Sequence, residues 1–215
     1  MQKLVIFLKA PRRGTVKTRL AAALGPEAAL AAYRELVERI LSQLRELPPV
    51  ELRFTPDDAR EEIQPRLAPG WSAASQGPGD LGTRLTRAFA DAFAAGAGRV
   101  VVIGSDCPEV TAADIREAWT ALGSHDLVLG PAHDGGYWLV GLRRPAPELF
   151  ADISWSTASV FEETLARARS QGLGVRLLRT LRDVDTPEDW EHYRASHPRA
   201  ETGAAEQPSL EARLV

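Results

Sequence analysis

The sequence predicts an α/β domain built on a mostly parallel sheet, and three observations lead to this prediction. Segments with the patterns of strands and helices alternate along the chain. The run Val100–Ile103 is continuously β-branched, which is typical of a strand buried on both faces of a parallel sheet. The chain has 215 residues, of which 44% are hydrophobic, and this is enough for one domain with a substantial core.

In the first half of the chain, apolar spacing and Gly or Pro breaks define the expected elements. Gly25-Pro26 ends one helix and Pro48-Pro49 ends the next. In order, we expect a strand at Leu4–Leu8, a loop at Lys9–Thr15, a short helix at Val16–Leu24, a helix at Glu27–Leu47, a strand at Val50–Thr55, a short helix within Pro56–Leu67 and a loop at Ala68–Gly82.

The second half continues the alternation, with Thr111 as a helix cap and Thr186-Pro187 as a helix start. Asp-Gly-Gly between two strand patterns also indicates a hairpin. In order, we expect a helix around Leu85–Phe93, a strand at Val100–Ile103, a helix to about Leu122, strands at Leu127–Gly130 and Tyr137–Leu142, a helix at Val160–Ser170, a strand at Val175–Leu178 and a helix at Pro187–Ala195. Residues 1–196 form the expected domain, and residues 197–215 are an expected disordered tail.

Composition narrows the classes of protein to which the chain can belong. The formal net charge is −3, so there is no basic field to hold nucleic acid. Cys107 is the single cysteine, which excludes an internal disulfide and favours a cytoplasmic location. No apolar stretch approaches the roughly 18 to 20 residues that a membrane-spanning helix needs. The oligomeric state is left open.

Asp106 lies just past the end of the strand at Val100–Ile103, which breaks at Gly104. Ligands bind at this edge of open α/β sheets, outside the carboxyl ends of the strands. A carboxylate here can bind a metal, act as a base or cap the next helix. A second acid from another strand end, such as Asp185, would complete a Mg²⁺ site, because Mg²⁺ takes one or two carboxylates together with phosphate oxygens and water.

The loop after the first strand has the composition of a phosphate-binding loop. It contains the basic residues Lys9, Arg12, Arg13, Lys17 and Arg19, and it places Gly14 near the start of a helix. A solvated basic loop is the alternative. Lys17-Thr18 resembles the end of a P-loop, but Val16 stands where that motif requires glycine, so a Walker-type ATPase is excluded.

Two further glycine-bearing loops complete the predicted cleft. The loop Gln76–Arg84 offers Arg84 to a phosphate or carboxylate, while Asp80 is either a ligand contact or a helix cap. The loop Gly130–Trp138 carries residues that suit an acceptor pocket: Asp134, Gly135, Gly136 and Tyr137. Cys107 has no recognisable His or Asp partner and is not predicted to be a nucleophile.

Taken together, five motifs in order resemble the bacterial DUF2064 family of the nucleotide-diphospho-sugar transferase superfamily. They are K-x-P-x-x-G-x-V-K-T-R-L, Q-G-x-G-D-L-G-x-R, I-G-S-D-C-P, P-x-x-D-G-G-Y-x-L-x-G and D-V-D-T-P-E-D, and they span roughly residues 3–193. The Lys17–Leu20 segment is also similar to 2-phospho-lactate guanylyltransferases, and molybdenum-cofactor nucleotidyltransferases are more distant relatives. The resemblance implies a GT-A-type, Rossmann-like mixed sheet with helices on both faces.

The same resemblance implies roles for individual residues. Asp106 would be the principal metal ligand and Asp185 the second, with Mg²⁺ or Mn²⁺ as the ion. Lys17 and Arg19 would contact nucleotide phosphates, and Trp155, in I-S-W-S-T, would line the acceptor side. The chain lacks the D-x-D pair of many glycosyltransferases, because Gly104 stands two residues before Asp106.

The function expected from these observations is that of a metal-dependent transferase acting on a nucleotide-activated substrate. Glycosyl transfer from a nucleotide sugar to a small-molecule acceptor is the first interpretation. The alternative is nucleotidyl transfer, in which an NTP gives its NMP to a phosphorylated small molecule, with Lys17 and a metal neutralising the triphosphate. A second alternative is a non-catalytic regulator that binds nucleotides.

Overall fold

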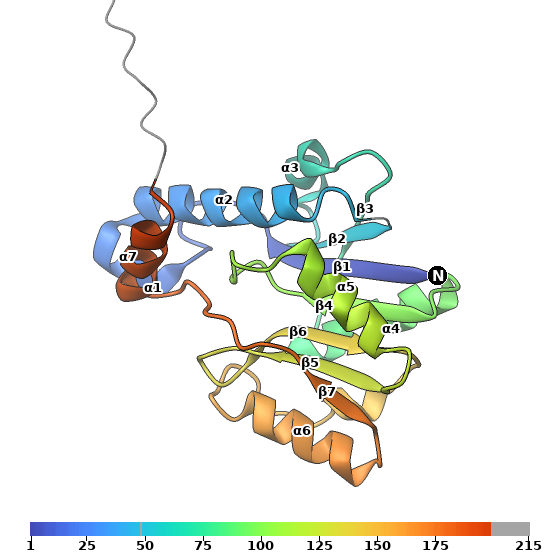
Figure 1. The fold of residues 1–215 in the computed structure, drawn as a ribbon. Helices are drawn as coiled ribbons and strands as arrows, with labels where there is room; N and C mark the ends of the chain where they lie inside the picture. The colour runs from blue at the N-terminus through green and yellow to red at the C-terminus, as the bar shows by residue number, and fades with distance from the viewer. Residues whose placement is uncertain (48, 199–215) are drawn as a thin grey trace, which may run out of the picture.

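The computed structural model describes residues 1–47 and 49–198 (Figure 1). Within these residues seven strands form one mixed sheet in the order β3-β2-β1-β4-β6-β5-β7. The strands are β1 (Gln2–Lys9), β2 (Val50–Thr55), β3 (Ser72–Ser75), β4 (Arg99–Ile103), β5 (Leu127–Pro131), β6 (Tyr137–Leu142) and β7 (Val175–Leu177). Only β6 runs antiparallel to its neighbours, β4 and β5. The predicted mostly parallel α/β sheet is therefore confirmed.

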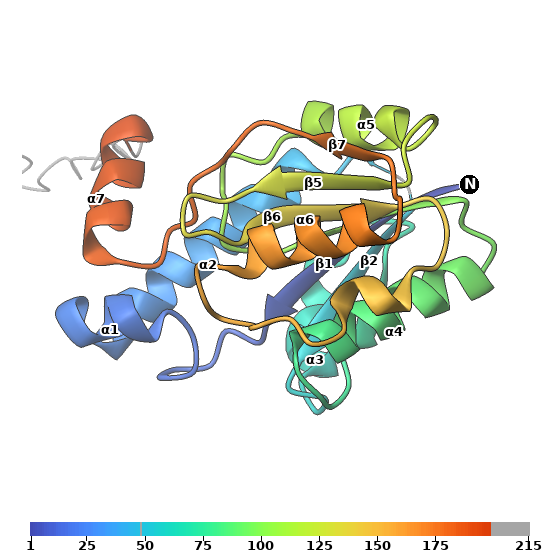
Figure 2. The same cartoon turned by 90° about the horizontal axis from the view of Figure 1, so that it is seen from below.

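Helices cover both faces of this sheet (Figure 2). One face carries α2 (Pro26–Gln43), α3 (Arg60–Ile63) with its continuation η1 (Gln64–Arg66), and α5 (Ala112–Ala121). The other face carries α4 (Leu81–Ala94), η2 (Pro147–Phe150) and α6 (Val160–Ser170). The short helices α1 (Thr18–Leu24) and α7 (Pro187–Ser196) lie together beyond the end of the sheet, where Trp190 packs against the cluster of Leu20, Ala29 and Ala32.

Strand β1 supplies both cores because its side chains alternate between the two faces. Leu4, Ile6 and Leu8 face the core that contains α2 and α5, whereas Val5 and Phe7 face the core that contains α4. All five side chains are buried. The uninterrupted apolar run at the start of the chain is thus explained by a central strand covered on both sides.

The predicted loop at Ala68–Gly82 is wrong in two places. The segment contains the edge strand β3, which pairs with β2 from Ser72 to Ser75, and α4 already begins at Leu81. The sequence Ser-Ala-Ala-Ser has no β-branched or aromatic residue, so its own propensity does not indicate a strand. Pairing with β2 imposes the extended conformation, and this tertiary effect leaves no pattern in the sequence.

The remaining predictions agree with the structure to within a few residues. The helix at Val160–Ser170 and the hairpin between β5 and β6 are confirmed. Thr111 and Asp114 form a reciprocal capping box at the start of α5. Of the predicted disordered tail, residues 199–215 lie outside the described part of the chain.

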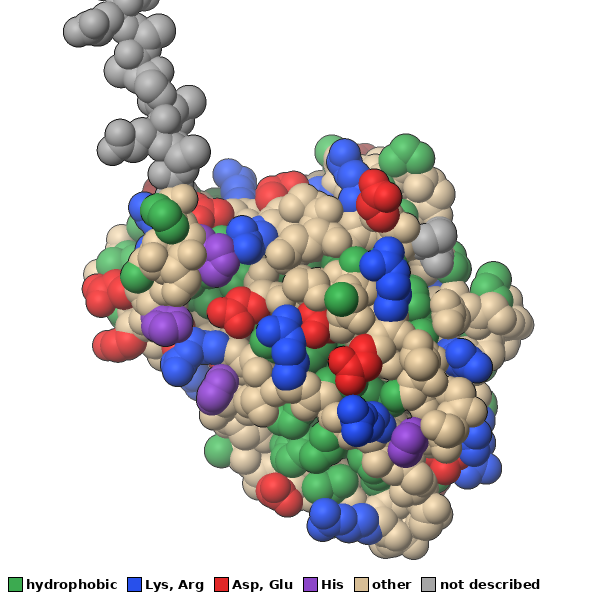
Figure 3. All heavy atoms as spheres, viewed as in Figure 1, with side chains coloured by type: hydrophobic (Ala, Val, Ile, Leu, Met, Phe, Trp, Pro, Cys, Tyr) green, Lys and Arg blue, Asp and Glu red, His purple; other side chains and the backbone are tan. Residues whose placement is uncertain are grey.

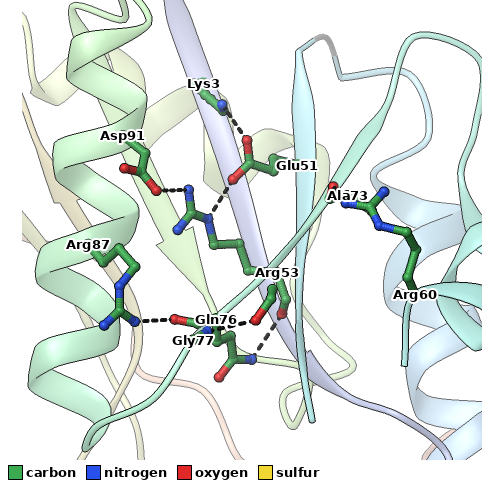
Figure 4. Close-up of polar contacts among 10 residues, drawn as sticks. Lys3, Glu51, Arg53, Arg60, Ala73, Gln76, Gly77, Arg87 and Asp91 are labelled. Atoms are coloured by element: carbon green, nitrogen blue, oxygen red, sulfur yellow. Dashed lines mark hydrogen bonds and ion pairs between the residues drawn. The ribbon is translucent and has the colours of Figure 1, made fainter. Parts of the chain in front are cut away.

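A buried ionic network ties α4 to β1 and β2 on the face opposite α2 (Figure 4). Glu51 accepts hydrogen bonds from Lys3 (2.6 Å) and Arg53 (2.5 Å), and Arg53 also reaches Asp91 of α4 at 2.6 Å. Burial alone would raise the pKa of Glu51, but the two cations hold it below its usual value. Because the charges are paired, these strands keep polar side chains in the interior without leaving a charge unpartnered.

The surface charge on one face and the length of the helices are two further features of the described residues. Lys, Arg, Asp and Glu side chains are interspersed over the face seen in Figure 3, so that face presents no broad field of one sign. Among the described residues, no helix is both long and apolar enough to cross a bilayer.

Candidate functional site

A cleft of about 960 Å³ opens where the carboxyl ends of β1 and β4 separate. All four predicted loops contribute to its lining, through residues such as Lys17, Gln76, Asp106 and Asp134. The segment 155–158 and the aspartates at 183 and 185 complete the wall. The structure therefore brings together motifs that lie up to 168 residues apart in the sequence, at the sheet edge where open α/β folds bind ligands.

Lys17 stands at the centre of this cleft. Its ammonium donates hydrogen bonds to Asp106 Oδ1 and, at 2.8 Å, to Asp185 Oδ1. Only 2% of the Lys17 side chain is exposed, compared with 49% for Asp106 and 37% for Asp185. One buried cation thus holds two carboxylates that remain open to the cleft.

The backbone at Lys17 is unusual in the same place. Lys17 occupies the N-cap position of α1 with φ 48° and ψ 50°, in the left-handed region that non-glycine residues rarely adopt. Its carbonyl accepts the Ala21 N–H at 2.8 Å, and the preceding Val16 is buried in the core. A lysine held in this conformation indicates that the surrounding contacts fix the ammonium position at some cost in backbone energy.

Asp106 and Asp185 are brought together by backbone pairing. Gly104 and Ser105 carry the chain out of β4, and the Asp106 carbonyl then accepts the Val184 N–H at 2.9 Å. Upstream of Val184, the Leu181 N–H donates to the Pro131 carbonyl at 3.1 Å, so the segment runs along the end of β5. Thr186 then caps α7 through a capping box with Asp189. Asp185 therefore projects from a segment anchored on both sides.

The charges around Lys17 define what its amine can do. Burial alone would lower the pKa of the ammonium, but Asp106 and Asp185 raise it above its usual value. The amine consequently stays protonated and cannot serve as a nucleophile. Burial, together with the negative charge of Asp106, also raises the pKa of the Cys107 thiol, so the thiolate is disfavoured as well.

Only part of the basic first loop faces the cleft. Lys9 and Arg19 join Lys17 in its lining. Arg12 instead pairs with Asp58 and Glu62, and Arg13 pairs with Glu27. Gly14 is exposed and is not among the lining residues. The solvated-loop interpretation therefore applies to the tip of this loop, while its two ends line the cleft, where the phosphate contacts stay a prediction.

In the second loop, Gln76–Arg84, some residues also line the cleft and others stabilise the fold. Asp80 accepts the Thr83 N–H at 2.8 Å and caps α4, as the helix-cap alternative predicted. Arg84 lines the cleft, where it donates to Gln76 Oε1 (3.1 Å) and the Gly79 carbonyl (3.0 Å). Arg87 fastens the same loop by donating to the carbonyls of Gln76 and Pro78. Figure 4 shows Gln76 and Arg87 beside the buried ionic network.

The predicted acceptor residues also lie at the cleft. Asp134, Gly136, Tyr137 and Trp155 line the cleft, and Gly135 packs behind it. A Cβ on Gly135 would fall 2.2 Å from the Ala158 carbonyl oxygen, and its φ is +88°, so this position requires glycine. Gly82 is required for a related reason, since a Cβ there would lie 2.8 Å from Trp155 Nε1. These glycines allow the loop 134–136 and the N-terminus of α4 to close around the segment 155–158.

Several lining residues are not among the predicted site residues, although the sequence offers Asp183 as the alternative to Asp185 for the second acid. Asp183 lies in the cleft, where burial and the nearby Asp134 carboxylate raise its pKa to about 6. Tyr33 also contributes to the lining, together with Ser105. Tyr33 follows the apolar spacing of α2, so its pattern does not separate it from a core residue. Asp183 stands in an acidic run that helix capping explains only in part.

The residues present fit a hydrated divalent cation. Among the described residues, Lys17 is the one side chain hydrogen-bonded to Asp106 or Asp185, so each carboxylate retains an oxygen for a metal. The described residues contain no group of three or more His, Cys, Asp or Glu side chains placed to hold a metal. Two carboxylates are the protein share that Mg²⁺ takes when phosphate oxygens and water supply the other ligands.

Comparison with known proteins places this chain in a family. The DUF2064 model, described as an uncharacterized protein conserved in bacteria, matches residues 40–157. Phosphoenolpyruvate guanylyltransferase from Sphaerobacter thermophilus is 31% identical over 196 residues, which cover 87% of this chain and 90% of that protein. A crystal structure from Desulfovibrio desulfuricans G20, described as a candidate nucleotide-diphospho-sugar transferase, is 33% identical with a TM-score of 0.86, and covers 93% of this chain and 89% of its own.

A more distant neighbour shares the fold alone. CMP:2-keto-3-deoxy-manno-octonic acid synthetase, solved with CTP, is 12% identical with a TM-score of 0.59 and covers 91% of this chain and 97% of its own. The two closer relatives confirm the predicted enzyme class, a transferase. Since the family model covers more than half of the chain and the guanylyltransferase relative spans most of it, the protein belongs to the DUF2064 family.

Proposed function

We propose that this protein is a nucleotidyltransferase that moves a nucleoside monophosphate from an NTP to a small phosphorylated acceptor, with Mg²⁺ or Mn²⁺ present. The observation that carries the proposal is the buried Lys17 ammonium, fixed between Asp106 and Asp185 at the ligand edge of the sheet. The relative named phosphoenolpyruvate guanylyltransferase supports this choice over glycosyl transfer. It also makes GTP the first nucleotide to test.

The basic residues that line the cleft suit a triphosphate. Lys9, Lys17 and Arg19 come from the first loop and its helix, and Arg84 comes from α4. An ammonium has three donors, and Lys17 uses two of them on the carboxylates. The third remains for a phosphate oxygen. Lys17 thus links the carboxylates to the nucleotide as a fixed positive charge.

In the proposed reaction, an oxygen of the acceptor phosphate attacks the α-phosphorus of the NTP. A new phosphorus–oxygen bond forms while the bond from the α-phosphorus to the bridging oxygen breaks, and pyrophosphate leaves with that electron pair. A phosphate monoester is already largely ionised at neutral pH, with a second pKa of about 6, so no side chain has to remove a proton. The protein contributes positioning and positive charge, which are the principal requirements of this chemistry.

Asp106 and Asp185 would hold the divalent cation. When bound, it would neutralise negative charge that develops on the departing phosphates. The wall formed by Asp134, Tyr137 and Trp155 would receive the acceptor.

A pyrophosphate-release assay tests the proposal. Purified protein is incubated with each NTP, with Mg²⁺ or Mn²⁺, and with phosphoenolpyruvate as the acceptor. We expect release that requires the NTP, the acceptor and the metal, with NMP found on the acceptor by mass spectrometry. Arg12→Ala serves as a control, because Arg12 belongs to the same loop but pairs outside the cleft.

Glycosyl transfer from a nucleotide sugar is the second candidate, favoured by the description of the Desulfovibrio relative. The two reactions leave different products. A nucleotide sugar would release a nucleoside diphosphate and no pyrophosphate. If the protein releases a nucleoside diphosphate from a nucleotide sugar in a metal-dependent way and turns over no NTP, it is a glycosyltransferase and the proposed nucleotidyl transfer is wrong. Binding of nucleotides without turnover of either class would instead favour a regulator.

A further inference from the structure

Tyr33 occupies the point at which β1 and β4 separate. The last residue pair between these strands is Ile6 with Ile103, so the end of β1 has no strand partner on the β4 side. Lys9 is the final residue of β1, and its N–H donates to the Tyr33 hydroxyl at 2.8 Å. The same hydroxyl donates to the Lys9 carbonyl at 2.9 Å. One side chain from α2 thus takes the place of a strand.

The hydroxyl also reaches the other loop of the site. Ser105 Oγ lies 3.5 Å from it, one residue before Asp106. A phenol has one proton and two lone pairs, and the proton is used on the Lys9 carbonyl. Because the phenol proton is used on Lys9, Ser105 is the donor in this contact, which at 3.5 Å is at the outer limit of a hydrogen bond.

We propose that Tyr33 is a positioning residue that sets the spacing between the loop bearing Lys17 and the loop bearing Asp106. The first of these loops begins immediately after Lys9, and the second contains Ser105. Tyr33 is 3% exposed, so water cannot readily replace its hydroxyl at either loop. The residue acts through Lys17 and Asp106 and does not itself contact the reacting atoms.

This inference rests on the proposed function for its kinetic consequence. Misplacement of a catalytic group by about 1 Å can reduce turnover by about a hundredfold. For Tyr33→Phe we expect kcat to fall roughly ten- to a hundredfold, and KM for the NTP to rise by a smaller factor. The phosphate contacts proposed for Arg19 and Arg84 do not depend on the phenol, so part of the NTP binding is retained, whereas Lys9 and Lys17 belong to the loop that the phenol holds.

A second readout is independent of any substrate. The chain contains three lysines, Lys3, Lys9 and Lys17. In protein labelled with ¹⁵N-lysine, the buried and ion-paired Lys17 ammonium should exchange its protons slowly, and Lys17→Arg assigns its signal. In Tyr33→Phe we expect this exchange to accelerate by about tenfold or more. Lys3 is the internal control, because its ammonium is also ion-paired but lies in the network on the opposite face.

Two variants separate positioning from general stability. Ser105→Ala keeps both bonds to Lys9 and should accelerate Lys17 exchange less than Tyr33→Phe does. Tyr193→Phe removes another buried phenol hydroxyl, on α7, where the ring packs against Val184, and should accelerate Lys17 exchange less than Tyr33→Phe does.

Unchanged Lys17 exchange in a folded Tyr33→Phe protein would overturn the inference. Equal acceleration of Lys3 and Lys17 would also overturn it, because that result indicates general loosening of the fold. If the wild type releases no pyrophosphate, the proposed function fails, but the exchange measurement still decides the role of Tyr33.

Discussion

At the scale of single residues, Lys17 combines an unfavourable backbone conformation with a buried positive charge. Its left-handed conformation is maintained while its ammonium holds two carboxylates of the candidate site. Removing either carboxylate leaves the buried cation with one partner, which changes both the electrostatics and the geometry. Residues 106 and 185 can therefore be tested one at a time.

Asp106→Asn should abolish metal-dependent turnover and leave the fold intact. Asp106 is half exposed at a strand end, so the isosteric amide creates no cavity, but it is a poor metal ligand. We expect a loss of activity of about a hundredfold or more, with an unchanged far-UV circular dichroism spectrum. Asp185→Asn should weaken metal dependence in the same direction. Asp152→Asn, at an exposed carboxylate outside the cleft, is the matched control. Full activity of a folded Asp106→Asn protein contradicts the metal assignment.

At the scale of elements, capped helix ends help to position the site, in addition to Tyr33 from the interior of α2. Asp80 starts α4, Thr111 starts α5 and Thr186 starts α7, each through a side-chain cap. At α5, Asp114 also accepts two hydrogen bonds from Arg179, at 2.7 and 2.8 Å. Arg179 lies in the segment that leads from β7 to Asp183 and Asp185, so this capping box also anchors the second acidic segment.

Asp114→Ala should destabilise the protein by about 2 kcal/mol at pH 7, because it removes a cap and a charged hydrogen-bond partner. Burial alone would raise the pKa of Asp114, but Arg179 and Thr111 hold it below its usual value. Because the pKa of Asp114 is lower in the folded state, its charge stabilises the fold fully at pH values above the unfolded-state pKa of about 3.9. This stabilisation is lost as the pH falls below that value and through the folded-state pKa. We expect urea unfolding between about pH 7 and pH 3 to show how the free energy of unfolding differs between the wild type and Asp114→Ala. This deficit should be constant down to about pH 5 and should shrink below about pH 4.

Thr111→Ala is the control for that measurement. It removes a neutral cap at the same helix and should cost about 1 kcal/mol with a much weaker pH dependence. A deficit of Asp114→Ala that grows as the pH falls would contradict the assigned role of its charge.

At the scale of the whole molecule, the sequence predicts those parts that local patterns encode. The buried run Val100–Ile103 identifies a central strand, and the turn after it identifies Asp106. Lys17 and Asp106 meet because β1 and β4 place their carboxyl ends at one edge of the sheet. Asp185 was expected at a strand end but lies beyond β7, just before α7, and it reaches the site because the Val184 N–H donates to the Asp106 carbonyl. Tyr33 and β3 escaped prediction because tertiary contacts define them. For Arg12 and Arg13 the local pattern misleads. Their charges suggest a phosphate-binding loop, but they form ion pairs with Glu62 and Glu27.

Binding of a triphosphate through Lys17 is what the proposed nucleotidyl transfer requires of the cleft. Isothermal titration of the wild type and Lys17→Ala with GTP and GDP, in the presence of Mg²⁺, tests it most directly. The wild type should prefer GTP. Loss of a charge-assisted hydrogen bond of about 1.5–3 kcal/mol should weaken GTP binding roughly ten- to a hundredfold, and GDP binding much less. Arg12→Ala should bind both nucleotides as the wild type does. Equal weakening of GTP and GDP binding, or unchanged binding of both, would contradict the account.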